Sequence, residues 1–358
     1  MDKKANKKDV IVPIIIPSYE PTESLLELLN QPELKNEIIV VINDGSDERY
    51  DVIFDKCNKL ENCTVIRHAV NLGKGRALKN GFNYVLNEYP NAVGVITADS
   101  DGQHSAKSIL KCKNALIKNP HALIMGCRDF DRDDIPWKSV YGNKITRKIC
   151  SFLCGISVSD TQTGLRGIPT DFMKILLNVP GERFEYETNM LIETRNKFEI
   201  REVPIETIYD SKENHATHFD TVKDSIRIYS IFAKIFLKYI FSSLSSAVVD
   251  IVLFVLFSSI FINVNKIYYA AISTIFARII SASYNFTINY KLVFSSEKNK
   301  KQSIVKYFLL AIIQMILSAT FVTIGIQLIS FAPDVVVKII VDGILFFLSY
   351  FVQRKYIF

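Results

Sequence analysis

Asp99 and Asp101 stand directly after the apolar run of residues 92–98, and their type and spacing suit metal chemistry. Side chains alternate along a strand, so two carboxylates one residue apart leave its end on the same side. Carboxylate oxygens are hard ligands, and Mg²⁺ or Mn²⁺ takes one or two of them together with substrate phosphate. The structural alternative is an Asp-Ser-Asp-Gly turn that caps a helix beginning near Ser105. The two aspartates therefore indicate either a metal and phosphate site or a turn.

Other apolar runs in the first half of the chain also end at polar or glycine-bearing loops that lead into helical patterns. These runs are residues 10–17, 37–42 and 63–68. Alternating strands and helices predict a mostly parallel sheet covered on both faces. Ligands bind at the carboxyl ends of the strands in such sheets. The residues that fall there are Tyr19, Asp44, Lys74 and Asp99.

The composition separates the chain into two parts. Of its 358 residues 49% are hydrophobic and 22% charged, but apolar blocks dominate from Tyr239 onward, whereas the chain up to about Asp224 has a soluble α/β pattern. The net charge of +6 is modest and no nucleic-acid-binding signature accompanies it, so we expect no nucleic acid partner. The polar start, and six cysteines confined to the first part, predict a cytosolic head with reduced thiols.

Five motifs occur in a fixed order along the head, and together they carry a family resemblance. They are Ile-Pro-Ser-Tyr at 16–19, Asn-Asp-Gly-Ser at 43–46, Asn-Leu-Gly-Lys-Gly at 71–75, Asp-Ser-Asp-Gly-Gln-His at 99–104 and Asp-Thr-Gln-Thr-Gly-Leu-Arg at 160–166. This set resembles the inverting family 2 glycosyltransferases of GT-A fold, in the branch of dolichol-phosphate mannosyltransferases and polyprenyl-phosphate glucosyltransferases. One departure is Glu20-Pro21, where the family often has Asn after the tyrosine.

The resemblance implies a nucleotide-sugar donor with a UDP or GDP base. Asp44 would read the nucleobase, and Asp99 would face the ribose and diphosphate. The metal, Mg²⁺ or Mn²⁺, would bridge the diphosphate and be held by Asp99, Asp101 and Gln103. The remaining nucleotide contacts would be Pro17, Tyr19 and Lys74. Independently of the resemblance, sugar transfer from a nucleotide needs a diphosphate leaving group, whose developing charge a metal neutralises.

The acceptor implied by the resemblance is a lipid monophosphate, undecaprenyl or dolichyl phosphate. Arg128 and Arg147 are the candidates for its phosphate, and Arg166 is a further catalytic candidate, because a bidentate guanidinium suits a phosphate group. The acceptor phosphate would attack the anomeric carbon, and since it is ionised near pH 7 it needs no strong base. Glu187, in a Phe-x-x-Glu segment, would orient the acceptor or act as the base. The predicted catalytic residues are Asp99, Asp101, Arg128, Arg166 and Glu187.

Four apolar segments in the second part are each near the ~20 residues that a bilayer core requires. They are residues 239–262, 267–290, 304–330 and 335–351. An amphipathic stretch at 217–238 precedes them and predicts a helix in the membrane interface. Lysines and arginines gather in the loop after the second segment and at the C-terminus. The positive-inside rule therefore places the head, that loop and the C-terminus in the cytosol.

Residues 284–294 and residues 348–358 form an internal sequence repeat, which indicates two helix pairs related by duplication. This part resembles the GtrA-like four-helix membrane family, which implies handling of polyprenyl-phosphate sugars. Charges at mid-span are costly and usually paired, so Asp250 and Arg278 are predicted to form an ion pair. Either a structural clamp or a path for lipid head groups would explain such a pair.

The predicted fold is an α/β GT-A domain, Rossmann-like with a mostly parallel sheet, followed by an all-α four-helix transmembrane domain. We expect the catalytic domain at 1–216, the interfacial helix at 217–238 and the transmembrane domain at 239–358. The predicted function is transfer of one hexose, with glucose the first guess, from a UDP- or GDP-sugar to polyprenyl phosphate at the cytosolic membrane face. The alternatives are a lipid-linked sugar transporter or scaffold, and a processive polysaccharide synthase. Assembly into a homo-oligomer stays open.

Overall fold

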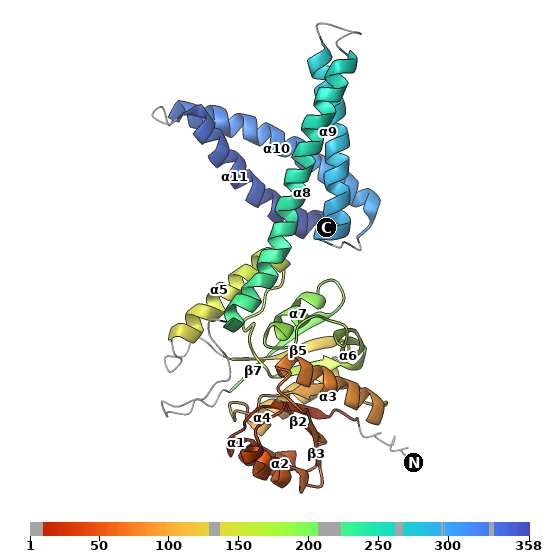
Figure 1. Ribbon diagram of the computed structural model, residues 1–358, viewed down its shortest axis with the longest axis vertical. Helices are drawn as coiled ribbons and strands as arrows, with labels where there is room; N and C mark the ends of the chain where they lie inside the picture. The colour runs from red at the N-terminus through yellow and green to blue at the C-terminus, as the bar shows by residue number, and fades with distance from the viewer. Residues whose placement is uncertain are drawn as a thin grey trace, which may run out of the picture. The chain divides into compact units, whose positions relative to one another are not determined.

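The computed structural model describes residues 10–128, 137–206, 223–261, 268–294, 296, 298–328 and 333–358. The chain divides into two compact units. Unit 1 comprises residues 1–151 and 156–231, and unit 2 comprises residues 152–155 and 232–358. The first is an α/β unit and the second is helical, as predicted (Figure 1).

Unit 1 is built on a seven-stranded sheet with the order β3-β2-β1-β4-β6-β5-β7. β1 lies parallel to β2 and β4, β2 is parallel to β3, and β5 is parallel to β7. β6 runs antiparallel to both β4 and β5, so the sheet is mostly parallel, as predicted. The strands are β1 Ile14–Ser18, β2 Ile39–Asn43, β3 Cys63–Arg67, β4 Gly94–Thr97, β5 Ala122–Arg128, β6 Arg166–Pro169 and β7 Glu199–Ile205.

Helices flank the sheet of unit 1 (Figure 1). The α-helices are α1 Ser24–Leu29, α2 Asp51–Asn58, α3 Lys74–Glu88, α4 Ala106–Lys118, α5 Trp137–Cys154, α6 Thr170–Leu176 and α7 Glu185–Glu193, with short 3₁₀ helices at η1 Pro32–Leu34 and η2 Glu48–Tyr50. The predicted helix start near Ser105 is confirmed, because the Ser105 side chain accepts a hydrogen bond from Ser108 N at 3.2 Å as the N-cap of α4. The capping side chain is therefore that of Ser105 and not one of the two aspartates.

β6 and β7 were not predicted from the sequence. β6 has only four residues, Arg-Gly-Ile-Pro, and therefore shows no apolar run. β7 lies at the sheet edge and alternates charged and apolar residues, Glu-Ile-Arg-Glu-Val-Pro-Ile, with most of its side chains at least partly exposed. Both strands depend on pairing with β5, a contact between distant parts of the sequence.

Strand register brings the predicted site residues to one sheet edge. Ser18 pairs with Asn43 at the ends of β1 and β2, and Asp44 N donates to Ser18 O at 2.8 Å. β4 lies on the other side of β1, with Thr97 opposite Ile15. The buried cluster of unit 1 includes Ile14, Ile16, Val41 and Ile96. Their burial makes the strands a rigid base for the loops that follow them.

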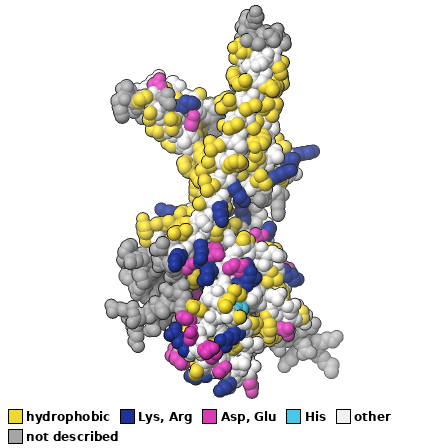
Figure 2. Space-filling model, viewed as in Figure 1, with side chains coloured by type: hydrophobic (Ala, Val, Ile, Leu, Met, Phe, Trp, Pro, Cys, Tyr) yellow, Lys and Arg dark blue, Asp and Glu magenta, His cyan; other side chains and the backbone are white. Residues whose placement is uncertain are grey.

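Unit 2 contains four long α-helices, the first of which begins within unit 1. They are α8 Lys223–Phe261, α9 Tyr269–Ile288, α10 Lys300–Leu328 and α11 Asp334–Val352. Among the described residues, three helices are long and apolar enough to cross a membrane, Lys223–Phe261, Lys300–Leu328 and Val336–Ile357. Figure 2 shows hydrophobic side chains spread over the outer surface of these helices, which suits contact with lipid.

Three of the four predicted spans thus correspond to helices that are long and apolar enough to cross a membrane. α9 forms where the second span was expected, but it is not among the three, and it carries Arg278, Asn285 and several hydroxyl side chains. Its crossing of the membrane stays a prediction. Residues 217–222 of the predicted interfacial helix lie outside the described residues, and residues 223–238 belong to α8.

The internal repeat has a structural counterpart. α9 and α11 each continue into a five-residue π-helical segment, Asn289–Val293 and Gln353–Ile357. The equivalent residues Asn289 and Gln353 meet, with Asn289 Nδ2 donating to Gln353 Oε1 at 3.0 Å. Each also bonds the residue four positions earlier, Asn289 to Asn285 Oδ1 at 2.8 Å and Gln353 to Ser349 Oγ at 2.9 Å. The two helix pairs therefore join through matching polar groups.

The predicted ion pair within the apolar helices is confirmed. Arg278 Nη2 lies 3.4 Å from Asp250 Oδ2, and Asp250 Oδ1 also accepts from Ser281 Oγ at 2.7 Å. In the other helix pair, Asp342 accepts from Ser318 Oγ at 2.6 Å and pairs with Lys338 at 3.0 Å. Each helix pair thus provides its carboxylate with one hydroxyl and one cation as partners.

Replacing Asn289 with Leu should lower the thermal unfolding midpoint of the full-length protein in detergent. The side chain of Asn289 is buried, and its loss leaves the acceptors of Gln353 and Asn285 without this donor. The cost should be about 1–2 kcal/mol. A double variant with Gln353→Leu should recover part of the loss.

Thr274→Ala is the matched control, because exposed Thr274 donates to Ala270 O of its own helix, at 2.8 Å. An Asn289→Leu midpoint no lower than that of Thr274→Ala would show that the junction between the repeats adds nothing to stability.

Candidate functional site

Lys74 is the centre of the site, at the first residue of α3. Its Nζ lies 2.7 Å from Asp99 Oδ1 and 3.1 Å from the carboxylate of Glu187. Only 15% of the Lys74 side chain and 8% of the Glu187 side chain are exposed, so water screens these charges weakly. One ammonium therefore joins the loop after β4 to α7, across long stretches of sequence.

The charges of this cluster stabilise one another. Burial alone would lower the pKa of Lys74, but the negative charges of Asp99 and Glu187 and their hydrogen bonds outweigh it, so that pKa is raised. For Asp99, burial would raise the pKa, yet Lys74 and then His104 outweigh it and hold the pKa well below its usual range. Lys74 and Asp99 consequently stay charged over the whole physiological range.

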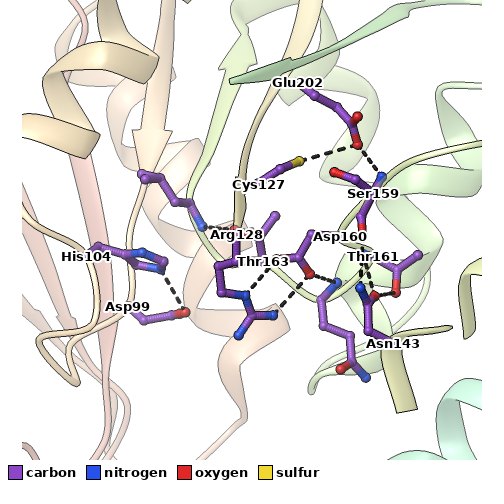
Figure 3. Close-up of polar contacts among 12 residues, drawn as sticks. Asp99, His104, Cys127, Arg128, Asn143, Ser159, Asp160, Thr161, Thr163 and Glu202 are labelled. Atoms are coloured by element: carbon purple, nitrogen blue, oxygen red, sulfur yellow. Dashed lines mark hydrogen bonds and ion pairs between the residues drawn. The ribbon is translucent and has the colours of Figure 1, made fainter. Parts of the chain in front are cut away.

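The second oxygen of Asp99 has two neighbours that fix its position. His104 Nε2 lies 3.3 Å from Asp99 Oδ2, and both side chains are drawn in Figure 3. Gly164 packs against the same carboxylate, and a Cβ at Gly164 would collide with both carboxylate oxygens. His104 belonged to the sequence motif but was given no role there, and the contact with Gly164 depends entirely on tertiary packing.

Asp101 and Gln103 follow Asp99 in the same loop. Asp101 Oδ1 accepts a hydrogen bond from Gln103 N at 3.0 Å. Burial and then the negative charge of Asp99 raise the pKa of Asp101. A carboxylate whose charge is disfavoured by a neighbouring carboxylate is a position where a bound cation is favourable.

The donor set fits Mg²⁺ or Mn²⁺ that keeps part of its shell for substrate oxygens. Asp99, Asp101 and Gln103 offer only hard side-chain oxygens, as these ions prefer. No group of three or more His, Cys, Asp and Glu that could hold a metal occurs among the described residues. Ions of this kind commonly complete their shell with water and substrate phosphate.

Asp44 holds the loop that carries Lys74. Its Oδ1 accepts from Leu72 N at 3.0 Å and lies 2.7 Å from His68 Nδ1, while Oδ2 accepts from Gly73 N at 2.7 Å. His68 Nε2 lies 2.8 Å from Asn80 Nδ2 of α3. His68 and Asn80 were not singled out from the sequence, since lone polar residues give no signal there. The predicted contact of Asp44 with a nucleobase stays a prediction.

The start of α3 packs closely on the segment before α7. Gly73 has φ +99°, a conformation that favours glycine, and a Cβ there would collide with Glu182 O. Arg76 N donates to Glu182 O at 3.0 Å, and the Glu182 carboxylate accepts from Arg76 at 2.8 Å and Lys79 at 3.1 Å. These contacts of Glu182 with Arg76 and Lys79 hold α3 and α7 at the separation that lets Lys74 reach Glu187.

Arg128 and Arg166 have different surroundings. Arg128 forms a bidentate pair with Asp160, at 2.7 and 3.0 Å, at the end of β5 (Figure 3). Arg166 is fully buried and donates to Thr163 O at 2.9 Å and Glu187 O at 2.8 Å. The structure therefore gives Arg166 a positioning contact, because it ties the Asp160 segment to α7.

The segment around Asp160 is held from several sides. Asn143 of α5 donates to Ser159 O at 2.9 Å and accepts from Thr161, and Glu202 of β7 accepts from Ser159 N (Figure 3). Asp160 itself has no exposed surface. Arg128 is consequently held by an anchored carboxylate.

The structure thus brings some predicted residues together and leaves others apart. Lys74, Asp99 and Glu187 share direct contacts, with Asp101 and Gln103 in the adjoining loop. Pro17 is buried in β1, Tyr19 is partly exposed after it, and Arg147 lies on the exposed side of α5. Burial, then the negative charges of Glu20 and Asp44, raise the pKa of Tyr19.

Two family models match the chain. The one described as Glycosyl transferase family 2 matches residues 14–176, and the one described as GtrA/DPMS, transmembrane domain, matches residues 238–358. The first range includes Asp44, Lys74, Asp99 and Arg166, and Glu187 lies beyond it.

Three curated relatives match most of unit 1 in length. An uncharacterized protein of Methanocaldococcus jannaschii is 30% identical over 212 residues, which are 57% of this chain and 83% of that protein. The UDP-N-acetylglucosamine–dolichyl-phosphate N-acetylglucosaminyltransferase of Methanococcus voltae is 28% identical over 222 residues, 56% of this chain and 87% of that enzyme. The dolichyl-phosphate beta-glucosyltransferase of Saccharomyces cerevisiae is 24% identical over 236 residues, 57% of this chain and 69% of that enzyme.

Replacing Gly164 with Ala should weaken Mn²⁺ binding about tenfold, because the new Cβ displaces the Asp99 carboxylate from its place beside Lys74. Mn²⁺ affinity can be followed by electron paramagnetic resonance on the full-length protein. Gly142→Ala is the control, since nothing lies within 4 Å of a Cβ there. Equal Mn²⁺ affinity in the Gly164→Ala and Gly142→Ala variants would contradict the role of this contact.

Replacing Lys74 with Ala should destabilise the protein by about 3 kcal/mol at pH 8, because two partly buried carboxylates lose their cation. Stability of the variant should then rise as the pH falls to 5, because burial without the Lys74 charge should raise the pKa of Asp99 and let the folded state take up a proton. In the unchanged protein, the lowered pKa of Asp99 and the raised pKa of Lys74 keep this contribution constant between the ordinary pKa values of 3.8 for aspartate and 10.5 for lysine.

Thermal unfolding midpoints at pH 5 and pH 8 measure this difference, with exposed Lys59→Ala as the control. A Lys74→Ala variant that loses stability equally at both pH values would show that unbalanced carboxylate charge is not the cause.

Proposed function

The chain belongs to the family 2 glycosyltransferases as an integral membrane hexosyltransferase with a GtrA/DPMS transmembrane domain, and we propose that it transfers one hexose from a UDP- or GDP-sugar to a polyprenyl phosphate. The two named relatives are dolichyl-phosphate glycosyltransferases, which supports a polyprenyl phosphate as the acceptor class. The observation that carries the proposal is the Lys74–Asp99–Glu187 cluster beside Asp101, at the sheet edge where such enzymes hold a donor.

On the donor side, Asp99, Asp101 and Gln103 would hold Mg²⁺ or Mn²⁺. That ion, when bound, neutralises charge on the diphosphate leaving group. Lys74 keeps Asp99 ionised and in place, so the carboxylate is ready before the donor arrives. Pro17, Tyr19 and Asp44 would contact the nucleoside.

On the acceptor side, Arg128 and Arg147 would bind the lipid phosphate. Asp160 holds Arg128 through Nε and Nη2, in a bidentate geometry that fixes the guanidinium plane. An acceptor phosphate oxygen would form the new bond to the anomeric carbon as the bond to the diphosphate breaks, which inverts that carbon. Glu187 would orient Lys74 and the acceptor rather than act as a strong base, because the phosphate is already ionised.

The membrane unit would bring this reaction to the lipid. We propose that residues 217–238 lie in the interface, residues 239–358 form the transmembrane domain, and the head of residues 1–216 is cytosolic. A purely transporting or scaffolding protein would not need the charged cluster at the sheet edge. A processive synthase would need a Gln-x-x-Arg-Trp motif, whereas the sole tryptophan is Trp137 in another context.

Purified full-length protein should release UDP or GDP from its nucleotide sugar only when polyprenyl phosphate and a divalent cation are both present. EDTA should abolish the release, and added Mn²⁺ should restore it. Asp101→Asn should lower turnover by about two orders of magnitude, because one cation ligand and its charge are lost. Release of nucleotide, and radiolabelled sugar in the lipid phase, are the two measurements.

Lys59→Ala, an exposed substitution, is the control for handling of the variants. Turnover that persists in EDTA, or nucleotide release that does not depend on the lipid, would contradict the proposed reaction. A panel of UDP- and GDP-hexoses against one polyprenyl phosphate would identify the sugar.

A further inference from the structure

Exposed lysines gather at one end of unit 2, and the proposed sugar transfer does not use them. They come from three stretches of the chain: the part of α8 just before Tyr239, the segment from the end of α9 to the first turns of α10, and the C-terminal segment. We call this set the basic rim. Its members, all exposed, are Lys234, Lys238, Lys291, Lys298, Lys300, Lys301, Lys306 and Lys355.

Contacts within unit 2 bring the three stretches together. Ser303 Oγ, in the first turn of α10, donates to Ile357 O at 2.9 Å. The hydroxyl of Tyr239 in α8 accepts from Gln353 Nε2 at 3.3 Å, and the Tyr239 ring centre lies 6.2 Å from that of Phe294. Figure 1 shows the C-terminus beside the segment that joins α9 to α10. The basic rim therefore occupies one end of the helical unit, although its members are far apart in the sequence.

The charge of these stretches is one-sided. Residues 232–240, 289–306 and 353–358 contain nine basic residues, which are the eight members of the rim and Arg354. Their single acidic residue is Glu297, which lies outside the described residues. Cations held together at one end repel one another, and negative charge on a facing surface offsets that repulsion. The basic rim is therefore suited to contact with an anionic surface.

Exposed apolar side chains stand between the lysines of the rim. Leu292 is 63% exposed and Val305 is 68% exposed, and Tyr356, next to Lys355, is also exposed. Figure 2 shows Lys and Arg side chains beside the hydrophobic surface of the helices. Lysines mixed with aliphatic and tyrosine side chains are typical of the boundary between acyl chains and lipid head groups. The anionic surface that fits this end of unit 2 is therefore that of a bilayer.

The residue type in the rim also bears on the ligand. A lysine ammonium is a single point charge on a flexible stem, whereas two-point hydrogen bonding of one phosphate needs a guanidinium. All members of the rim are lysines, and they are spread over three stretches. Many separate phosphates along a surface therefore fit the rim better than one firmly held phosphate.

We propose that the basic rim of unit 2 binds the head groups of anionic bilayer phospholipids, such as phosphatidylglycerol. The lysines contact the phosphodiester groups, and Leu292, Val305 and Tyr356 contact the adjoining part of the acyl chains. This role is separate from sugar transfer and requires only that unit 2 lies in a bilayer. The ligand is the bulk anionic lipid of the membrane and not the polyprenyl phosphate acceptor.

Spin-labelled lipids in phosphatidylcholine vesicles that contain the full-length protein test this proposal. Electron paramagnetic resonance separates the lipid held at the protein from the freely moving lipid. Phosphatidylglycerol should associate with the protein at least about fivefold more strongly than phosphatidylcholine of the same acyl chains, the ratio that one lysine near an anionic lipid provides. The preference should fall in about 1 M NaCl, because salt screens exposed charges.

Replacing Lys300, Lys301 and Lys355 together with Gln should remove at least about half of the preference for phosphatidylglycerol. The matched control replaces three exposed lysines of unit 1 with Gln, which lowers the net charge equally and should leave the preference unchanged. These lysines are Lys35, Lys59 and Lys118. Replacing the three rim lysines with Arg keeps their charge and should also keep the preference.

Three results would overturn the proposal. Equal association of the two lipids would show that the rim has no preference for anionic lipid. A loss in the unit 1 control or in the Arg variant as large as in the Gln variant would show that the charge of the rim is not the cause. Removal of the bound phosphatidylglycerol by one equivalent of polyprenyl phosphate would show that the rim holds a single phosphate monoester lipid instead.

Discussion

The bridge of Lys74 between Asp99 and Glu187 is the interaction on which the site depends. It joins the first turn of α3, the loop after β4 and α7, which no short-range contact would hold together. Three charged groups with little exposure are costly to bury, and they are tolerated because each carboxylate has the same ammonium as a partner. Glycine is required around this bridge, since a Cβ at Gly164 would collide with Asp99 and a Cβ at Gly73 would collide with Glu182 in the segment before α7.

A second layer of contacts keeps the bridge in place. Asp44 binds the amides of the loop before Lys74, and Glu182 binds Arg76 and Lys79 on the next turns of α3. Both are carboxylates whose hydrogen bonds are used for holding backbone or helix positions. Asp99 differs, because Lys74 and His104 hold its pKa well below its usual range.

The membrane unit also has to provide partners for polar side chains in an apolar setting, and it does so through contacts between helices. Its helices expose many apolar side chains, as a lipid solvent requires, and they bury polar side chains such as Ser242, Asn285 and Asn289 in contacts between helices. Asn289 and Gln353 meet at equivalent positions of the two helix pairs, and each pair also contains one satisfied carboxylate, Asp250 and Asp342. Each carboxylate finds its partners within its own helix pair, and Asn289 and Gln353 join the two pairs.

The sequence by itself determined the strands with continuous apolar runs, the edge at which Asp44, Lys74 and Asp99 gather, the repeated membrane helices and the Asp250–Arg278 pair. These follow from periodicity, strand polarity and the cost of charge in an apolar setting, all of which are local or nearly so. Only the tertiary structure decided that β6 runs antiparallel, that Arg166 is buried on backbone carbonyls, and that His68 and Asn80 complete the bonding of Asp44. Those facts depend on contacts between residues far apart in the chain, where a single polar side chain carries no sequence signal and packing alone chooses its partner.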